Sequence, residues 1–145
     1  MTFDQVADAA QVSRALVHTY LGDRRGLLDA VQVLIVARMD TWVGHSLRRA
    51  TTPPGRLRAI TGALFAFVEA ERDPWGVLVA SGGLDHPALH GVRGRWCTQI
   101  ADGGSATDLG IQAAVVGLIS GVGGWVNRGA EPEAVSDALV RLLPT

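Results

Sequence analysis

The residues of this chain whose types could support metal binding are few and poorly grouped. His86 and His90 stand four positions apart, a spacing that lets two imidazoles on one helix face bind a metal ion. Pro87 lies between them, and Asp85 is the nearby carboxylate, so the sequence offers two ligands and no third. We therefore predict no metal site, with a two-histidine site as the alternative.

The single cysteine, Cys97, supports neither an intrachain disulfide nor a zinc site, because no second thiol and no Cys/His cluster accompanies it. We predict that Cys97 is a small core residue. The chain also shows no Ser/His/Asp set, no glycine-rich phosphate loop ahead of a helix and no paired carboxylates. These patterns predict a protein that is not an enzyme and needs no cofactor, and the lone thiol fits a cytoplasmic location.

Composition narrows the classes further. The chain has 145 residues, of which 48% are hydrophobic, and its formal net charge is −1. A chain of this length forms one ordinary domain, or a small module joined to a helical body. The near-zero charge excludes a global basic field that would draw the protein to nucleic acid or to anionic membranes. No charged segment followed by an apolar run opens the chain, so we expect no secretory signal.

Apolar residues recur at helical spacing along the chain, and no segment alternates as a strand does, so the predicted fold class is all-α. Asp73-Pro74 and Asp85-His86-Pro87 read as helix starts, with the aspartate as cap and proline in the first turn. A long helix is expected from Asp23, with Leu27, Val31, Leu34, Ile35, Met39 and Trp42 on its apolar face. The expected ranges are 3–10, 13–22, 23–45, 56–71, 75–80, 87–102, 109–127 and 132–143.

The first thirty residues combine two short predicted helices with a tight turn, an arrangement that suits DNA. The major groove is about 12 Å wide and admits one helix while the other lies across the backbone. Helical hairpins without a DNA function fit the spacing equally well. Three arginines stand against four aspartates in residues 1–30, so the electrostatic attraction to DNA is weak.

The residue types favour the DNA reading. The run Val6-Ala7-x-x-Ala10-Gln11-Val12-Ser13-Arg14, followed by Val17-His18-Thr19-Tyr20-Leu21-Gly22-Asp23-Arg24-x-Gly26-Leu27-Leu28, resembles the DNA-binding domain of TetR-family transcriptional regulators. The match covers about residues 2–30, and the remainder agrees in layout. The resemblance implies a helix-turn-helix in residues 1–30 and a helical ligand-binding and dimerisation domain in residues 31–145. Family members carry one more helix in front, so we expect that the numbering begins inside a longer natural protein or that the DNA-binding domain is incomplete.

The resemblance also assigns roles at the DNA. Arg14 and Ala15 would face base edges, and an Arg fork on guanine contributes roughly 1–3 kcal/mol of discrimination. The residues expected to contact phosphates are Thr2, Ser13, His18, Tyr20 and Arg24, with Thr19 beside them. A buried ring for Tyr20, and a solvated helix face for His18 and Thr19, are the alternatives.

Residues 109–127 are apolar enough to raise a membrane span as an alternative, because about 20 such residues cross a bilayer. Side-chain size argues for soluble packing instead. Large side chains fall on one side of this predicted helix, at Ile111, Val115, Leu118, Val122 and Trp125. The resemblance implies a dimer formed by the last two helices, and the predicted interface residues are Ala113, Gly117, Ser120, Gly121, Gly124 and Leu139.

The resemblance further implies a cavity for an apolar effector among the central helices. The predicted lining residues are Met39, Trp42, Phe65, Phe67, Trp75 and Trp96. Plain core packing is the alternative, because large aromatic side chains bury well in either setting. The leading prediction is a cytoplasmic homodimeric repressor that binds double-stranded DNA at a palindromic operator and is released by an apolar small molecule. The alternative is a helical ligand-binding and dimerisation module without DNA binding.

Overall fold

A computed structural model of the chain describes residues 5, 8 and 24–144. Within these residues the protein is helical and has no strand, which confirms the all-α prediction. Gln5 and Asp8 are helical and exposed. The elements are α3 (Arg24–Leu47), α4 (Pro53–Ala70), α5 (Arg72–Ala80), the short 3-10 helix η1 (Gly83–Asp85), α6 (Pro87–Ala101), α7 (Leu109–Asn127) and α8 (Pro132–Val140).

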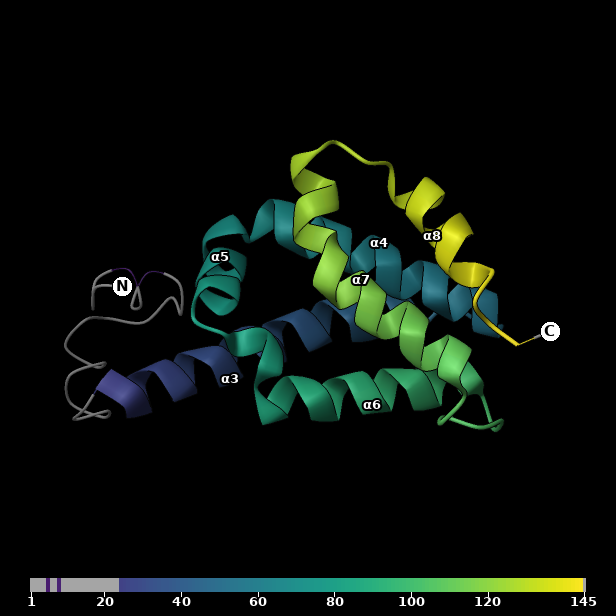
Figure 1. Cartoon of the computed structure of the whole chain (residues 1–145), viewed down its shortest axis with the longest axis horizontal. Coiled ribbons are helices and arrows are strands. Elements are labelled where there is room, and N and C mark those ends of the chain that lie inside the picture. The colour runs from purple at the N-terminus through teal and green to yellow at the C-terminus, as the bar shows by residue number, and fades with distance from the viewer. Residues whose placement is uncertain (1–4, 6–7, 9–23, 145) are drawn as a thin grey trace.

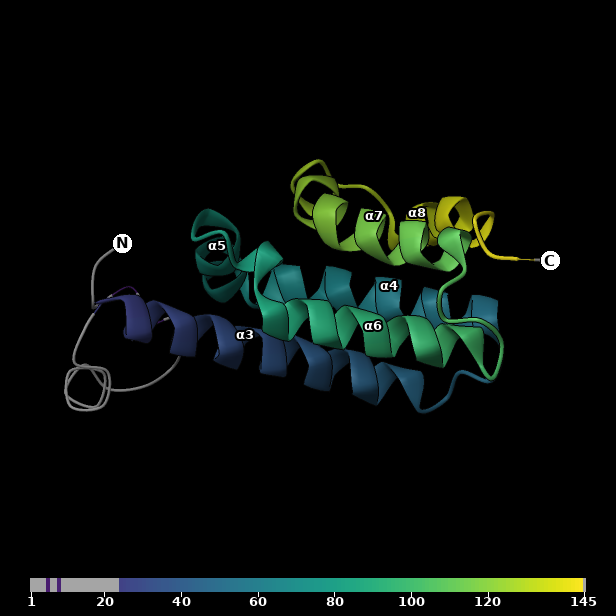
Figure 2. The same ribbon diagram turned by 60° about the horizontal axis from the view of Figure 1, so that its bottom comes forward.

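Helix α4 is the centre of the described bundle and contacts α3, α5, α6, α7 and α8. Figure 2 shows α7 and α8 side by side as one layer, α4 and α6 beneath them, and α3 on the far side. The first turns of α3 project beyond the other described helices (Figure 1). Residues 24–30, the described end of the stretch that carries the resemblance, therefore stand at one end of the described bundle.

Local capping explains where α4 begins. Thr52 accepts a hydrogen bond on Oγ1 from the Gly55 N–H at 3.0 Å, and Pro53 and Pro54 occupy the first helical positions. Proline fits there because the first-turn N–H groups have no partner within the helix. The helix therefore starts three residues earlier than the sequence predicts, since the two prolines belong to it.

The aspartates predicted to cap two helices do not do so. Asp73 lies in the first turn of α5, whose N-cap is Glu71, the residue that also ends α4. His86 caps α6, with its Nδ1 accepting the Ala88 N–H at 3.0 Å. Both predictions were wrong because a proline shows roughly where a helix begins, but it does not show which residue serves as the N-cap.

The predicted long face of α3 is largely confirmed, with one exception. Leu27, Val31, Ile35 and Met39 are at most 2% exposed. Leu34 is 45% exposed and lies off the buried face, whose additional members are Gln32, Val36 and Val43. The buried face of α3 therefore extends to the side of Gln32, Val36 and Val43, and the apolar pattern of the sequence did not indicate this side.

Helix α7 has the bounds that the sequence predicts, residues 109–127. Asp108 caps it by accepting the Ile111 N–H on Oδ1 at 3.0 Å. Gly129, with φ +73°, reverses the chain at the other end, and the Ala130 N–H reaches the Trp125 carbonyl at 2.9 Å. Glycine adopts this left-handed conformation without the Cβ clash of other residues.

Among the described residues, α7 is the helix long and apolar enough to cross a membrane by length and composition, and 39% of that apolar stretch is buried within the subunit. Four residues of the predicted face are at most 2% exposed, namely Ile111, Val115, Leu118 and Val122, and Ala114, Ile119 and Val126 are buried beside them. Trp125 is half-buried. The large-residue side of α7 is therefore filled by the protein's own core.

Loss of the α7 cap should lower stability measurably. Asp108→Ala removes the acceptor for the Ile111 N–H, and the expected loss in free energy of unfolding is about 1 kcal/mol. Asp108→Asn keeps a capping oxygen and should retain most of that stability. Urea unfolding followed by circular dichroism measures both, and equal midpoints for the Ala and Asn variants would contradict the assignment.

Candidate functional site

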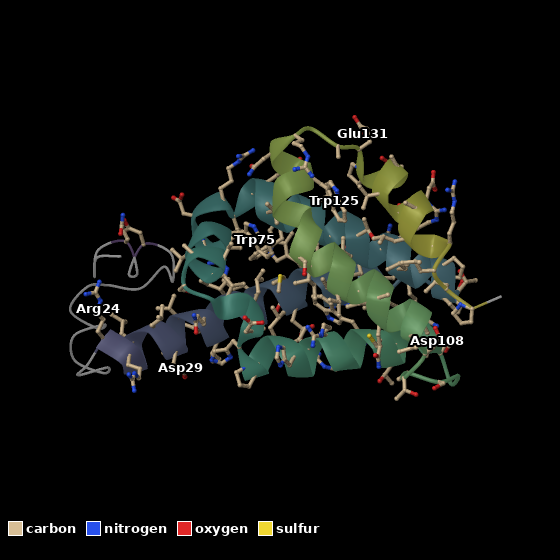
Figure 3. All side chains as sticks on the ribbon, viewed as in Figure 1. Arg24, Asp29, Trp75, Asp108, Trp125 and Glu131 are labelled. Atoms are coloured by element: carbon tan, nitrogen blue, oxygen red, sulfur yellow. The ribbon has the colours of Figure 1, made fainter. Side chains whose placement is uncertain are left out.

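The predicted DNA contacts fall almost entirely outside the described residues. Arg24 is the described member, and it is exposed at the first position of α3. Figure 3 shows Arg24 at the end of α3 that projects from the bundle. The residues whose structure is not described are Thr2, Ser13, Arg14, Ala15, His18, Thr19 and Tyr20. Their roles at DNA stay predictions.

The first half of α3 is tied to the bundle by two polar links. The Gln32 side chain is 7% exposed, and its Nε2 donates to Ser81 Oγ at 2.9 Å and to the Ser81 carbonyl at 3.2 Å. A buried amide that lost these acceptors would cost about 1–3 kcal/mol, so the pairing fixes α3 against the end of α5. Sequence reasoning missed this link, although Gln32 at helical spacing from Val36 and Met39 marks a polar residue within an apolar face.

His86 and Asp29 form the second link. His86 Nε2 lies 2.7 Å from Asp29 Oδ1, and Asp29 is on the projecting part of α3 (Figure 3). Because Nδ1 accepts the Ala88 N–H, the proton of a neutral His86 sits on Nε2 and is donated to the carboxylate. The imidazole thus joins α3 to the start of α6. In this arrangement both ring nitrogens of His86 are engaged, so the two-histidine metal site, the alternative to the prediction of no metal, would lack one of its ligands.

The second half of α3 is held by charged groups. Arg95 donates from both terminal nitrogens to Asp40 Oδ2 at 2.9 Å, and Trp96 Nε1 donates to Asp40 Oδ1 at 3.0 Å. Arg38 pairs with Glu71 at the end of α4. These contacts fix α3 to α6 and to the junction of α4 and α5. The long helix is therefore braced along its length, from Asp29 to Asp40.

The six residues predicted to line an effector cavity lie in or against the hydrophobic core. Five are at most 8% exposed: Met39, Phe65, Phe67, Trp75 and Trp96. Trp42 is half-buried and packs edge-to-face on Phe67, with ring centroids 5.7 Å apart. Trp42 also lines a cavity of about 480 Å³ between α3 and α4, together with Thr41, His45, Ser46, Gly62, Ala63 and Ala66. Of the six predicted lining residues, Trp42 lines this cavity, and the other five lie in the hydrophobic core.

The predicted dimer residues on α7 are open to different degrees. Ala113 and Ser120 are exposed, and no heavy atom lies within 4 Å of the position a Cβ would take at Gly117. At Gly121 that position is 2.6 Å from the Trp125 ring, and at Gly124 it is 3.2 Å from the Arg128 guanidinium. The free small-residue surface of α7 is therefore centred on Gly117 and does not extend to Gly121, which the Trp125 ring covers.

Leu139, the remaining predicted interface residue, is 8% exposed and belongs to the core cluster. Helix α8 packs on α4 and α7 through this side. Its opposite face carries exposed residues, including Ala138. Leu139 thus helps to place α8 within the subunit.

The surroundings of His86, His90 and Cys97 bear on metal binding and on nucleophilic chemistry. Within residues 5, 8 and 24–144, no group of three or more His, Cys, Asp or Glu side chains could hold a metal ion. Cys97 is 4% exposed, in agreement with a core position. Burial raises the pKa of its thiol, and the positive charge of Arg93 opposes that rise. A thiol with a raised pKa is mostly protonated at neutral pH and is a poor nucleophile.

The described chain is thus an all-α protein in which one long, braced helix projects from a bundle. The curated proteins to which it is similar are all named as HTH-type transcriptional regulators. The chain is 37% identical over 67 residues to the HTH-type transcriptional regulator BetI of Burkholderia mallei (strain NCTC 10229) and of Burkholderia pseudomallei (strain K96243). The match covers 44% of this chain and 33% of each relative, so it spans about a third of their length. No family model matches the chain, and no solved structure matches it.

Proposed function

We propose that this protein is a DNA-binding transcriptional regulator of the TetR type. The observation that carries the proposal is the 37% identity to HTH-type regulators, together with the helix-turn-helix pattern in residues 2–30. The bracing of α3 supports it, because α3 begins one residue after Asp23 and continues the chain of the reading segment. A regulator of this kind acts in the cytoplasm, where its DNA lies.

The proposed active form is a homodimer on a palindromic operator. Two reading helices must stand one turn of DNA apart, about 34 Å, and a two-fold dimer provides this spacing. The exposed small residues around Gly117 offer a surface on which a second α7 could pack closely. Because the large side of α7 fills the subunit core, the small side is the side available to a partner.

The proposed direction is repression relieved by an apolar small molecule. The cavity of about 480 Å³ at Trp42 is within the range of about 300–1,000 Å³ for small-molecule sites. Its residues lie on α3 and α4, so an occupant would bias the position of the helix that carries the reading segment. A ligand shifts the equilibrium only by its difference in affinity for the DNA-fitting and the released spacing.

Arg14→Ala should weaken operator binding about five- to hundredfold, since an Arg fork on guanine contributes roughly 1–3 kcal/mol. The probe is a genomic fragment selected by the wild-type protein, and the measurement is an electrophoretic mobility shift at fixed salt. Arg141→Ala removes an exposed arginine just beyond α8 and should bind as wild type. Equal affinity of the Arg14 variant and wild type would remove Arg14 from the base-reading role.

The second candidate is a helical ligand-binding and dimerisation module that does not bind DNA. The excess of aspartate over arginine in residues 1–30 favours it, because phosphate contacts supply most non-specific affinity. Selection of genomic fragments at about 50 mM salt separates the two candidates, since phosphate contacts are strongest there. Recovery of no fragment, with a soluble dimer in solution, would support the module and contradict the regulator.

A further inference from the structure

A polar cavity between α6 and α7 has no role in the proposed function. Its volume is about 230 Å³. It is lined by His90, Arg93, Gly94 and Cys97 from α6, Ala106 from the connection to α7, and Gln112 and Val116 from α7. The α6 residues are spaced by three, four and seven positions, so they share the helix face beside which α7 lies (Figure 1).

Arg93 distinguishes this cavity from the rest of the described surface. The described chain has three half-buried arginines, and two of them pair with carboxylates, Arg38 with Glu71 and Arg56 with Asp102. Arg93 is the third, and within residues 24–144 no carboxylate reaches it. Arg93 is not among the residues whose side-chain nitrogens are fully buried without a partner, so its guanidinium reaches solvent and can meet a dissolved anion. The position of Arg93 therefore favours an external anion.

The other walls suit the same kind of ligand. His90 and Gln112 also line the cavity, and both are exposed side chains that carry N–H donors. None of the described residues that line the cavity is Asp or Glu, so none of them repels a negative charge. One part of the cavity wall is apolar, and it is formed by Val116, Ala106 and the backbone of Gly94. The cavity therefore combines a cationic end with room for a short carbon chain.

We propose that this cavity binds a small organic carboxylate with a short aliphatic chain. The planar guanidinium of Arg93 donates two parallel hydrogen bonds to the two carboxylate oxygens, a geometry that suits a carboxylate. Gln112 and His90 donate to the same oxygens, and the carbon chain lies against Val116. The volume lies below the roughly 300 Å³ of drug-sized sites, which suits a ligand of a few carbon atoms. This site is separate from the cavity at Trp42, so binding there does not depend on the proposed function.

The test is isothermal titration of the full chain with sodium butyrate, without DNA, at an ionic strength held constant with sodium chloride. We expect saturable binding by wild type and a loss of tenfold or more in affinity for Arg93→Gln. Arg141→Gln, which removes an exposed arginine elsewhere, should bind butyrate as wild type. Tighter binding of inorganic phosphate than of butyrate, or unchanged affinity in the Arg93 variant, would overturn the proposal.

A second pair of variants tests the location without removing a charge. No heavy atom lies within 4 Å of a Cβ at Gly94 or at Gly91, so leucine fits at both positions on α6. Gly94 lines the cavity and Gly91 does not. Gly94→Leu should abolish butyrate binding while Gly91→Leu retains it, with both proteins as thermally stable as wild type. Weaker self-association of Arg93→Gln in the absence of any carboxylate would overturn the proposal, because a partner subunit's acid would then be the anion.

Discussion

Gly117→Leu should convert the protein into a monomer and remove operator binding. Gly117 lies at the centre of the open small-residue surface of α7, with no heavy atom within 4 Å of its Cβ position. Leucine therefore fits within one subunit and also improves helix propensity, so the monomer should fold. In a two-fold dimer the added side chain enters the interface twice, and overpacking costs about 1–3 kcal/mol each time. The dimer dissociation constant should rise about 30-fold or more.

Sedimentation equilibrium measures that constant, and a mobility shift on the selected fragment measures the DNA affinity. Gly44→Leu is the matched control, because Gly44 is an exposed glycine within α3 that also has open space at its Cβ position. This control should leave both quantities unchanged. A Gly117→Leu protein that stays dimeric and binds DNA would show that α7 does not form the interface through this face.

Trp96→Ala should cost about 3–5 kcal/mol in free energy of unfolding, the largest stability effect expected in the described core. Trp96 is fully buried, and its Nε1 donates to Asp40 Oδ1 at 3.0 Å. Truncation leaves a cavity the size of an indole and removes one of the contacts that hold α3 to α6. Against a typical total of about 5–15 kcal/mol, this loss lowers the melting temperature by about 10–20 °C.

Two further tryptophan variants separate burial from hydrogen bonding. Trp96→Phe keeps most of the apolar volume and loses the donor, so it should cost about 1–2 kcal/mol. Trp125→Ala makes the same truncation at a half-buried ring that covers Gly121, and it should cost less than Trp96→Ala. Differential scanning calorimetry orders the three proteins. If the Trp125 and Trp96 truncations were equally costly, the core assignment of Trp96 would be wrong.

The links along α3 give the proposed regulator a physical route from effector to DNA. Gln32 joins α3 to Ser81, and Asp29 joins it to His86. A shift of the α5–α6 corner therefore moves the projecting end of α3, on which Arg24 lies. The same helix forms one wall of the cavity at Trp42. Helix α3, which follows the predicted helix-turn-helix in sequence, thus also lines the proposed effector cavity.

The sequence alone determined the helical class and the ends of several helices. The bounds of α7 followed from a run of apolar and small residues without a charge, residues 109–127, and from Gly129 just beyond it. The sequence also predicted which side of α7 carries the large side chains, because residues at helical spacing lie on the same side. The predicted cap at Asp73 was wrong, because α5 begins at Arg72 with Glu71 as its N-cap, and Asp73 lies in the first turn.

Only the tertiary structure decided which side chains meet. Gln32 and Ser81 lie 49 positions apart in the chain, and Asp29 and His86 lie 57 apart, so no local pattern could pair them. The structure alone also showed that Leu139 faces the core, since either face of a short helix can pack inward. It alone placed Arg93 at a half-buried position where no carboxylate among residues 24–144 pairs with it. Such pairings depend on how distant helices pack, because burial is set by neighbours that the local sequence does not contain.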